Sequence, residues 1–419
     1  MSDLVPDIRT PVPGPGSRAL ADRLRRVECP EVTSLGVPPI FWECASGANV
    51  IDVDGNRYVD LLAGFGVAAL GYAHPEIADA WGEQAQLLPH AMGDVYPARV
   101  KVELLEALTR ILPANLGKAI LSSSGSDAVE SALKTAIRAT GRSGVIAFEG
   151  AYHGLGLGAL DTTHREFFRA PFEERLPRRT RFVPYGDAKA VREELARGDV
   201  GAILVEPIQG RGGCCVPPPD FLRELRELAD GTDTLLLADE VYTGLGRAGS
   251  WLACEAQGVI PDVVALGKGL GNGFPISACA GREDVMEAWG ESRGEAIHTS
   301  THLGNPVGCR VATRVLEIMD RDRLPERAAV LGARMLERLR AALADNPRVR
   351  EVRGRGLMLG IELVDAADAR RVVSEMLCEG WILLAEGADG RVLSLTPPLT
   401  ISEQLLESGV DRLVEHLRA

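Results

Sequence analysis

The chain has 419 residues, of which 46% are apolar and 25% charged, and its net charge is −13. This length is typical of a two-domain enzyme rather than of one small domain. The acidic balance argues against a nucleic-acid or anionic-membrane partner, because both require a basic face. We expect no transmembrane span and no secretory signal, because no long apolar run and no N-terminal apolar stretch occur.

The cysteines indicate a reducing compartment. They form no CxxC pair and no set with histidine at metal-ligand spacing, so we expect no metal site. Scattered thiols of this kind are typical of a cytoplasmic protein in which most are reduced and buried. The eight cysteines are Cys29, Cys44, Cys214, Cys215, Cys254, Cys279, Cys309 and Cys378.

The first 60 residues predict an arm followed by a hairpin. Residues 1–40 are rich in Pro and Gly, with a basic helical stretch at Ser17–Arg26, and predict an extended arm over a partner or another domain. Strand-like runs at Asn49–Val53 and Arg57–Asp60 flank the turn Asp54-Gly55-Asn56. Such a turn between two β-rich runs predicts a β-hairpin.

From about residue 100 onward, apolar β-rich runs alternate with helical periods. This alternation predicts an α/β fold with a mostly parallel sheet covered on both faces. The predicted strands are Ala119–Ser122, Val145–Phe148, Ala202–Val205, Leu235–Ala238 and Val263–Leu266. The predicted helices are Asp127–Thr140, Pro219–Ala229 and Pro306–Met319.

A long amphipathic helix at about Pro325–Ala344, followed by further strands and helices, predicts a second, smaller α/β domain. We therefore expect an arm and part of the small domain in residues 1–60. Residues 61–310 would form the large domain, and residues 311–419 the C-terminal small domain.

Ligands of doubly wound sheets bind at the C-terminal ends of the strands, and three unusual segments follow predicted strands. The first is Ser122–Asp127, which leads into a helix. Hydroxyl residues and a glycine at a helix N-terminus leave N–H groups that favour an anion such as phosphate. The alternative is an ordinary N-cap formed by Ser124 or Ser126.

The second segment is Asp239-Glu240, after the apolar strand Leu235–Ala238. A buried carboxylate needs a partner. A pyridinium nitrogen would serve, because the aspartate would keep the ring protonated and make it a better electron sink. A salt bridge to a core arginine is the alternative.

The third segment contains Lys268, directly after the strand Val263–Leu266. A lysine that enters a cleft loses its proton through desolvation and becomes a nucleophile. A surface lysine is the alternative, but the surrounding glycines indicate a close approach of backbone to a ligand. Neither these glycines nor those at 354–360 have the spacing of a nucleotide-binding motif, so we exclude nucleotide binding.

Together these segments resemble the class III, or ω-amino acid, aminotransferases of pyridoxal-5′-phosphate (PLP) fold type I. The sequence LLLADEVYTGLGRAG, followed by PDVVALGKGLGNGFP, is similar to that family's signature, and the resemblance extends from about residue 10 to 415. It implies a large PLP-binding domain with a mostly parallel seven-stranded sheet and a smaller α/β domain. The opening Pro11–Pro15 is similar to the arm of 4-aminobutyrate aminotransferases, and the ornithine type is also close.

The resemblance implies a ping-pong transfer of an amino group from an ω-amine or amino acid to a keto acid. Lys268 would form the Schiff base with PLP and act as the catalytic base, and Asp239 would pair with the pyridine nitrogen. Val241 would pack on one ring face, and Tyr152 would stack on the other. His153, beside Tyr152, would be structural.

Further cofactor contacts follow from the same resemblance. Gly125 and Ser126 match the phosphate-binding turn, and Glu206 lies in a matching segment. Tyr242 replaces a common Gln near the ring hydroxyl, where its phenol could still hydrogen-bond. Thr301 matches a threonine that reaches the phosphate of the neighbouring subunit, which implies a homodimer with shared active sites.

The sequence departs from the family at the expected substrate contacts. Many members have a Glu after Gln-Gly and an Arg before Pro-Pro-Leu; the Arg binds the α-carboxylate of the substrate, and the Glu covers it when other amines bind. Here these positions are Arg211 and Ser394. We expect Arg211 to supply a replacement cation, with a surface arginine as the alternative. Arg142 matches an arginine for the distal carboxylate, and Phe65 would narrow the pocket.

Two other functions stay open on the sequence alone. The loss of the usual Arg and Glu leaves another PLP reaction of the same family, namely that of a lyase, aminomutase, racemase or decarboxylase. Consumption of an amine without a keto acid would favour it. The second alternative is a catalytically silent dimer, which a colourless protein that cannot be reconstituted with PLP would support.

Overall fold

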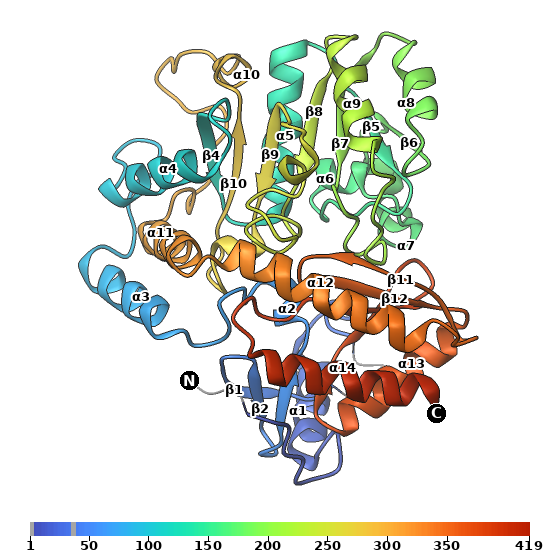
Figure 1. Ribbon diagram of the computed structural model, residues 1–419. Coiled ribbons are helices and arrows are strands. Elements are labelled where there is room, and N and C mark those ends of the chain that lie inside the picture. Colours follow the sequence, from blue (N-terminus) through green and yellow to red (C-terminus); the bar gives the residue numbers. More distant parts are fainter. Residues whose placement is uncertain (1–3, 35–38) are drawn as a thin grey trace.

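The computed structural model describes residues 4–34 and 39–419. Its seven-stranded sheet lies at one end of the molecule, and two four-stranded sheets lie at the other (Figure 1). Residues 1–3 and 35–38 of the predicted arm lie outside the described residues. The rest of the arm runs beside the hairpin, where Asp7 forms an antiparallel bridge with Arg57.

The large sheet has the strand order β4-β10-β9-β8-β7-β5-β6. Five neighbouring strands are parallel, and β10 runs antiparallel to both β4 and β9. The mostly parallel seven-stranded sheet of the predicted fold is therefore confirmed. Its strands are β4 (Lys118–Ser122), β5 (Gly144–Phe148), β6 (Thr180–Val183), β7 (Val200–Val205), β8 (Leu235–Asp239), β9 (Val263–Leu266) and β10 (Ser277–Gly281).

The five predicted strands are all present, but β6 and β10 were not predicted. The strand β6 is a partly exposed edge strand, so it lacks a continuous apolar run. The sequence of β10 is SACAG, whose small residues carry little β-propensity. Both strands form because a neighbouring strand supplies hydrogen-bond partners, which the local sequence does not reveal.

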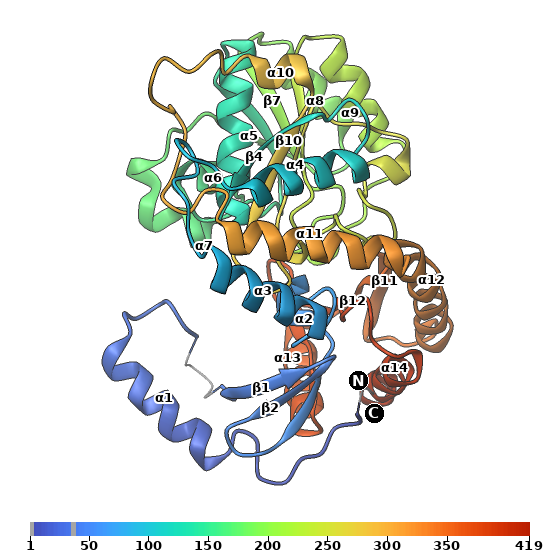
Figure 2. The same ribbon diagram turned by 90° about the vertical axis from the view of Figure 1, so that its left-hand side faces the viewer.

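Helices cover both faces of the large sheet, as the alternating pattern predicts. The helix α5 packs on one face, against β10, β9 and β7, and α9 packs on the other, against β8 and β7. Figure 2 shows α11 lying between the large sheet and α3. The helices of the first three quarters of the chain are α1 (Pro15–Val27), α2 (Ala63–Gly66), α3 (Pro75–Leu87), α4 (Arg99–Ile111), α5 (Gly125–Thr140), α6 (Leu157–Thr162), α7 (Glu166–Arg169), α8 (Ala188–Leu195), α9 (Phe221–Asp230), α10 (Glu283–Glu287) and α11 (Pro306–Arg321).

The first of the two small sheets combines strands from both ends of the chain, and the second consists of C-terminal strands only. The first has the order β1-β2-β3-β13 and the second β11-β12-β15-β14. The predicted hairpin is β2 and β3, and β3 also pairs in parallel with β13 from the C-terminal part. The elements are β1 (Trp42–Ser46), β2 (Asn49–Asp52), β3 (Arg57–Asp60), α12 (Leu324–Leu343), β11 (Val349–Arg355), β12 (Met358–Leu363), α13 (Ala366–Cys378), β13 (Trp381–Ile382), β14 (Leu384–Glu386), β15 (Val392–Leu395) and α14 (Glu403–Arg418). The predicted domain boundaries at residues 60 and 310 stay a prediction.

All eight cysteines are free thiols, and Cys214, Cys254, Cys279 and Cys309 are buried. Across the part of the chain that the structure describes, no helix is both long and apolar enough to cross a lipid bilayer. Within the same part, no cluster of three His, Cys, Asp or Glu side chains is arranged to hold a metal ion.

Candidate active site

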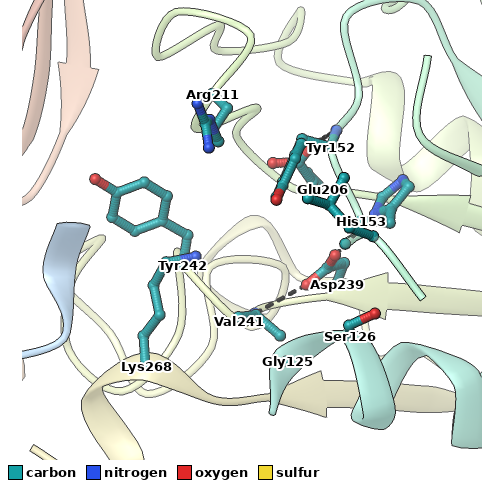
Figure 3. A pocket seen from close by; sticks show the side chains of 12 residues that line it. Gly125, Ser126, Tyr152, His153, Glu206, Arg211, Asp239, Val241, Tyr242 and Lys268 are labelled. Atoms are coloured by element: carbon teal, nitrogen blue, oxygen red, sulfur yellow. Dashed lines mark hydrogen bonds and ion pairs between the residues drawn. The ribbon is translucent and has the colours of Figure 1, made fainter. Parts of the chain in front are cut away.

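A cavity of about 350 Å³ opens where β7, β8 and β9 end and α5 begins (Figure 3). This is the C-terminal edge of the parallel strands, where ligands of such sheets bind. The predicted residues Lys268, Asp239 and Arg211 line the same cavity. The other lining residues are Gly125, Ser126, Tyr152, His153, Gly154, Leu155, Glu206, Val241 and Tyr242.

Asp239 is the last residue of β8, and its carboxylate is held in place from two sides. Oδ1 accepts a hydrogen bond from the backbone N–H of Val241 at 3.1 Å. Oδ2 lies 2.7 Å from Nδ1 of His153, which must donate because a carboxylate only accepts. His153, predicted to be structural, therefore orients Asp239 directly.

Glu206 is the second buried carboxylate of the cavity. Its two oxygens accept hydrogen bonds from the backbone N–H groups of Tyr152 at 2.9 Å and Gly210 at 3.0 Å. Burial raises the pKa of Glu206 to about 7, with His153 lowering and Asp239 raising it. In this structure Glu206 thus fixes the backbone that carries Tyr152.

Lys268 follows β9 with a left-handed backbone φ of +35°. Its Nζ lies 4.3 Å from the ring centroid of Tyr242, and Figure 3 shows the side chain extending toward that ring. Burial lowers the pKa of Lys268, and the charges of Asp239 and Glu206 oppose this shift. A lowered pKa supplies the neutral amine that a nucleophile requires.

Tyr242 presents its ring, rather than its hydroxyl, to Lys268. The hydroxyl lies 3.1 Å from Oγ1 of Thr396 and points away from the lysine in Figure 3. A hydrogen bond from this phenol to the cofactor hydroxyl stays a prediction. Thr396 directly follows the last residue of β15.

The N-terminus of α5 offers an anion site. Ser124 caps the helix by accepting from the backbone N–H of Asp127 at 3.2 Å. Among the described residues, none accepts from the N–H groups of Gly125 and Ser126. Free N–H groups at this end of a helix bind phosphate. The N-cap and the anion site are therefore features of the same turn.

Gly125 is required by close packing against Val241. A Cβ built on Gly125 would lie 2.7 Å from Cγ1 of Val241, which is too close for a real contact. The missing side chain lets Val241 lie directly between the helix terminus and Lys268 in the cavity wall. Val241 is therefore placed to support a flat ring whose phosphate meets the helix.

Arg211 projects into the cavity from the loop after β7. Its guanidinium carbon lies 4.9 Å from the ring centroid of Tyr152, 5.7 Å from that of Phe168 and 5.8 Å from that of Phe65. Cation–π contacts of this kind hold the guanidinium without neutralising it. No carboxylate of the described residues lies within ion-pair distance of Arg211. Phe65 itself contributes to this aromatic cage rather than to the cavity wall.

The structure does not bring Arg142 to the cavity, contrary to its predicted role. Arg142 follows the C-terminus of α5, and a 16-residue helix is about 24 Å long, so the residue lies at the opposite end of the sheet. Its guanidinium donates to the backbone carbonyls of Thr232 and Asp233. Arg142 therefore connects two loops.

Thr301 is exposed and does not line the cavity of its own chain. Ser394 is buried on β15, and its hydroxyl donates to Oε2 of Glu386 at 2.8 Å. Sequence reasoning missed Glu386. The only signal is an acidic residue at the end of the short apolar run that forms β14, and this signal is too weak to identify a site.

The residues of the cavity fit PLP. The amine of Lys268 can bond its aldehyde, and the buried carboxylate of Asp239 suits its ring nitrogen. The space left open by Gly125 and the free N–H groups of α5 suit its phosphate. Tyr152 and Val241 provide the two walls between which a flat ring can lie.

Comparison with known proteins agrees with this geometry. The family model for class-III aminotransferases matches residues 32–417. An acetylornithine aminotransferase of Methanopyrus kandleri is 41% identical over 91% of this chain and 95% of its own length. A 4-aminobutyrate aminotransferase of Mycobacterium leprae is 33% identical over 96% of both chains.

Among solved structures, an ornithine aminotransferase of Toxoplasma gondii is 31% identical, with a TM-score of 0.88 over 96% of this chain and 94% of that one. Its crystal structure is described as having PLP at partial occupancy in the active site. These relatives are named for amino transfer, which does not favour the alternative of another PLP reaction. On the family match, the overall similarity and the composition of the cavity, the chain belongs to the class-III aminotransferases, enzymes that transfer amino groups with PLP.

Proposed function

We propose that this chain is a cytoplasmic, homodimeric aminotransferase that moves an amino group from an ω-amine or amino acid to a keto acid by a ping-pong mechanism. The observation that carries the proposal is the presence of Lys268 and Asp239 in one cavity, at the ends of neighbouring parallel strands. A buried amine and a buried carboxylate at this edge of a sheet suit a ligand with an aldehyde and a basic ring nitrogen.

Lys268 has two roles in this proposal. Its Nζ would hold PLP through the aldehyde, and as a neutral amine it would move the proton at the donor carbon. Burial lowers the pKa of Lys268, which favours the neutral amine that this proton transfer requires. When bound, PLP supplies the electron sink for the electrons of the broken C–H bond.

The other residues bind and orient. Asp239, held by His153, keeps a proton on the ring nitrogen. Glu206 positions Tyr152 through its backbone N–H. Gly125 and Ser126 hold the phosphate, with Thr301 of the second subunit as a further contact. Arg211, which has a free guanidinium in a cage of aromatic rings, receives a substrate carboxylate.

The proposal is tested by locating the cofactor and separating the half-reactions. The purified protein should be yellow, and borohydride should attach the cofactor irreversibly to the peptide that contains Lys268. A donor amine without a keto acid should remove the visible absorbance, and a keto acid should restore it. Attachment to another lysine, or consumption of amine with no need for a keto acid, would contradict the proposal.

A further inference from the structure

Glu386 is an acidic side chain beside the cavity for which the proposed mechanism has no role. It ends β14, which is paired with β15, and Gly387 next to it donates its N–H to the backbone carbonyl of Arg211 at 3.3 Å. The strand end therefore touches the loop that carries the substrate arginine. Glu386 and Ser394 lie on the same face of the sheet, because side chains of adjacent strands align in this way.

The carboxylate of Glu386 is oriented but only half satisfied. Oε2 accepts from the hydroxyl of Ser394 at 2.8 Å. Oε1 is buried and has no hydrogen-bond partner among the described residues. A buried carboxylate oxygen without a partner is unfavourable unless a ligand supplies a donor. The unpaired Oε1 therefore supports a ligand site beside Glu386, in addition to the contact between the strand end and the loop of Arg211.

Glu386 lies near three cations without forming an ion pair with any of them. Burial raises its pKa, while the nearby charges of Arg211, Lys268 and Arg165 lower it. The charge of this carboxylate also raises the pKa of Lys268 and of Tyr242. Thr396, two residues after Ser394, lies 3.1 Å from the hydroxyl of Tyr242, which lines the cavity. None of these cations comes within ion-pair distance of Glu386 in the described structure.

Arg211 and Glu386 thus place opposite charges near the substrate, at positions where the family pattern has the reverse arrangement. The residue after Gln-Gly, where many members have a glutamate, is Arg211 in this chain. The residue of β15 where many members have an arginine is Ser394, and its hydroxyl donates to the carboxylate of Glu386. An acidic group on this side repels a substrate carboxylate and attracts an ammonium group.

We propose that Glu386, oriented by Ser394, determines substrate specificity by binding a second ammonium group of the amine donor, as in a diamine or a diamino acid. The inference rests on the proposed function, because it assigns the amine that reacts at Lys268. Oε1 accepts a hydrogen bond from the distal ammonium group. Arg211 binds the carboxylate of those substrates that carry one.

The test compares two donors of similar length, 1,4-diaminobutane and 4-aminobutyrate, which differ at the end that does not react. The rate at which each removes the visible absorbance of the PLP-loaded enzyme is followed as a function of amine concentration. For Glu386→Gln we expect the saturation constant of the diamine to rise at least about ten-fold, the effect of losing one hydrogen bond to a charged group. The value for 4-aminobutyrate should change by less than about three-fold, and the limiting rates should stay similar.

Three further variants complete the design. Arg211→Gln should show the opposite preference, raising the saturation constant of 4-aminobutyrate only. Ser394→Ala keeps the charge of Glu386 but removes its orientation, so the diamine alone should bind about three-fold more weakly. Glu337→Gln, on the exposed face of α12, should leave the saturation constants of both donors unchanged. Thermal unfolding and the cofactor spectrum check that each variant is folded and loaded.

Each outcome decides between the two proposals. Equal weakening of both donors in Glu386→Gln, or no weakening of the diamine, would overturn the role of Glu386 but leave the aminotransferase proposal intact. If Glu386→Gln does not fold, Ser394→Ala decides, and an unchanged diamine constant there overturns the inference. If neither these donors nor any other amine bleaches the wild-type enzyme, the proposed function fails and the inference fails with it.

Discussion

Nδ1 of His153 lies 2.7 Å from Oδ2 of Asp239, and both side chains are buried beside the cavity. The histidine comes from the loop after β5, whereas the aspartate ends β8. This contact therefore joins two parts of the large sheet at the cavity. It makes the orientation of the Asp239 carboxylate dependent on His153.

The contact gives a first prediction. Asp239→Asn removes the charge that keeps the ring nitrogen protonated, and we expect kcat to fall by about 100-fold or more. His153→Ala removes only the orienting hydrogen bond and should lower kcat about ten-fold. The saturation constants for substrate should change little in both. Equal activity of His153→Ala and wild type would show that Val241 alone orients Asp239.

The packing of Gly125 against Val241 gives a second prediction. In Gly125→Ala the new Cβ would lie 2.7 Å from Val241, so the helix terminus or the valine must shift. We expect the dissociation constant of PLP, measured by spectroscopic titration of the cofactor-free protein, to rise at least about ten-fold. The matched control is Gly117→Ala, where a Cβ meets no atom within 4 Å. Unchanged affinity in Gly125→Ala would contradict the phosphate assignment.

The titration of Glu206 gives a third prediction. Its pKa is raised to about 7 in the folded chain, from 4.5 in the reference state, so the folded protein binds a proton more tightly than the unfolded one. The stabilising effect of this proton is complete below pH 4.5 and is lost as the pH rises through 7. Relative to Glu206→Gln, wild type should therefore lose up to about 3 kcal/mol of unfolding free energy between pH 5 and 8.

The measurement is a series of denaturant unfolding curves at several pH values for both proteins. Gln accepts only one of the two backbone hydrogen bonds that Glu206 accepts, so a constant offset between the proteins is expected. Only the change of the difference with pH tests the prediction. A difference that is constant from pH 5 to 8, or that moves in the opposite direction, would contradict the raised pKa.

The position of Arg142 gives a fourth prediction, which is a lack of effect. Its guanidinium binds the carbonyls of Thr232 and Asp233 at the far end of the sheet. Arg142→Gln should therefore leave kcat/KM for acidic and neutral amines within about two-fold. Arg211→Gln, in the cavity, should lower kcat/KM for carboxylate substrates at least about ten-fold. A selective loss with acidic donors in Arg142→Gln would restore the role predicted from the sequence.

A fifth prediction concerns the core of the large sheet. Ile203 lies on β7, an interior strand of the large sheet, and is fully buried. Ile203→Ala leaves a cavity that tightly packed neighbours cannot fill, and we expect it to destabilise the protein by about 2–5 kcal/mol. Val330→Ala, on the exposed face of α12, should change stability by less than about 0.5 kcal/mol. The shift of the urea midpoint, followed by circular dichroism, compares the two.

The sequence predicted the cofactor side of the site because that chemistry is local. Asp239 and Lys268 each follow a buried apolar strand, and parallel strands bring their ends to one edge. The strands themselves stand out as continuous apolar runs. The functional pair could therefore be placed together before any tertiary contact was known.

The substrate side could not be predicted in this way. The acid at 386 is located by a short strand that pairs with β15 and by a contact with the loop of Arg211, 175 residues earlier in the chain. Arg142 was misplaced because family position alone does not reveal that α5 carries it away from the cavity. Such placements depend on long-range packing, which leaves no periodic trace in the sequence.

The parallel pairing of β13 with β3 has a consequence for how the polypeptide can be divided. Trp381 and Ile382 of β13 pair with β3, which lies some 320 residues earlier in the chain. The strand β3 is therefore synthesised before the large sheet. A fragment that starts at residue 311 would expose the edge of β13, and uncovered strand edges recruit other chains. The C-terminal quarter of this enzyme therefore depends on the hairpin, which is synthesised first and covers this edge of β13 in the folded chain.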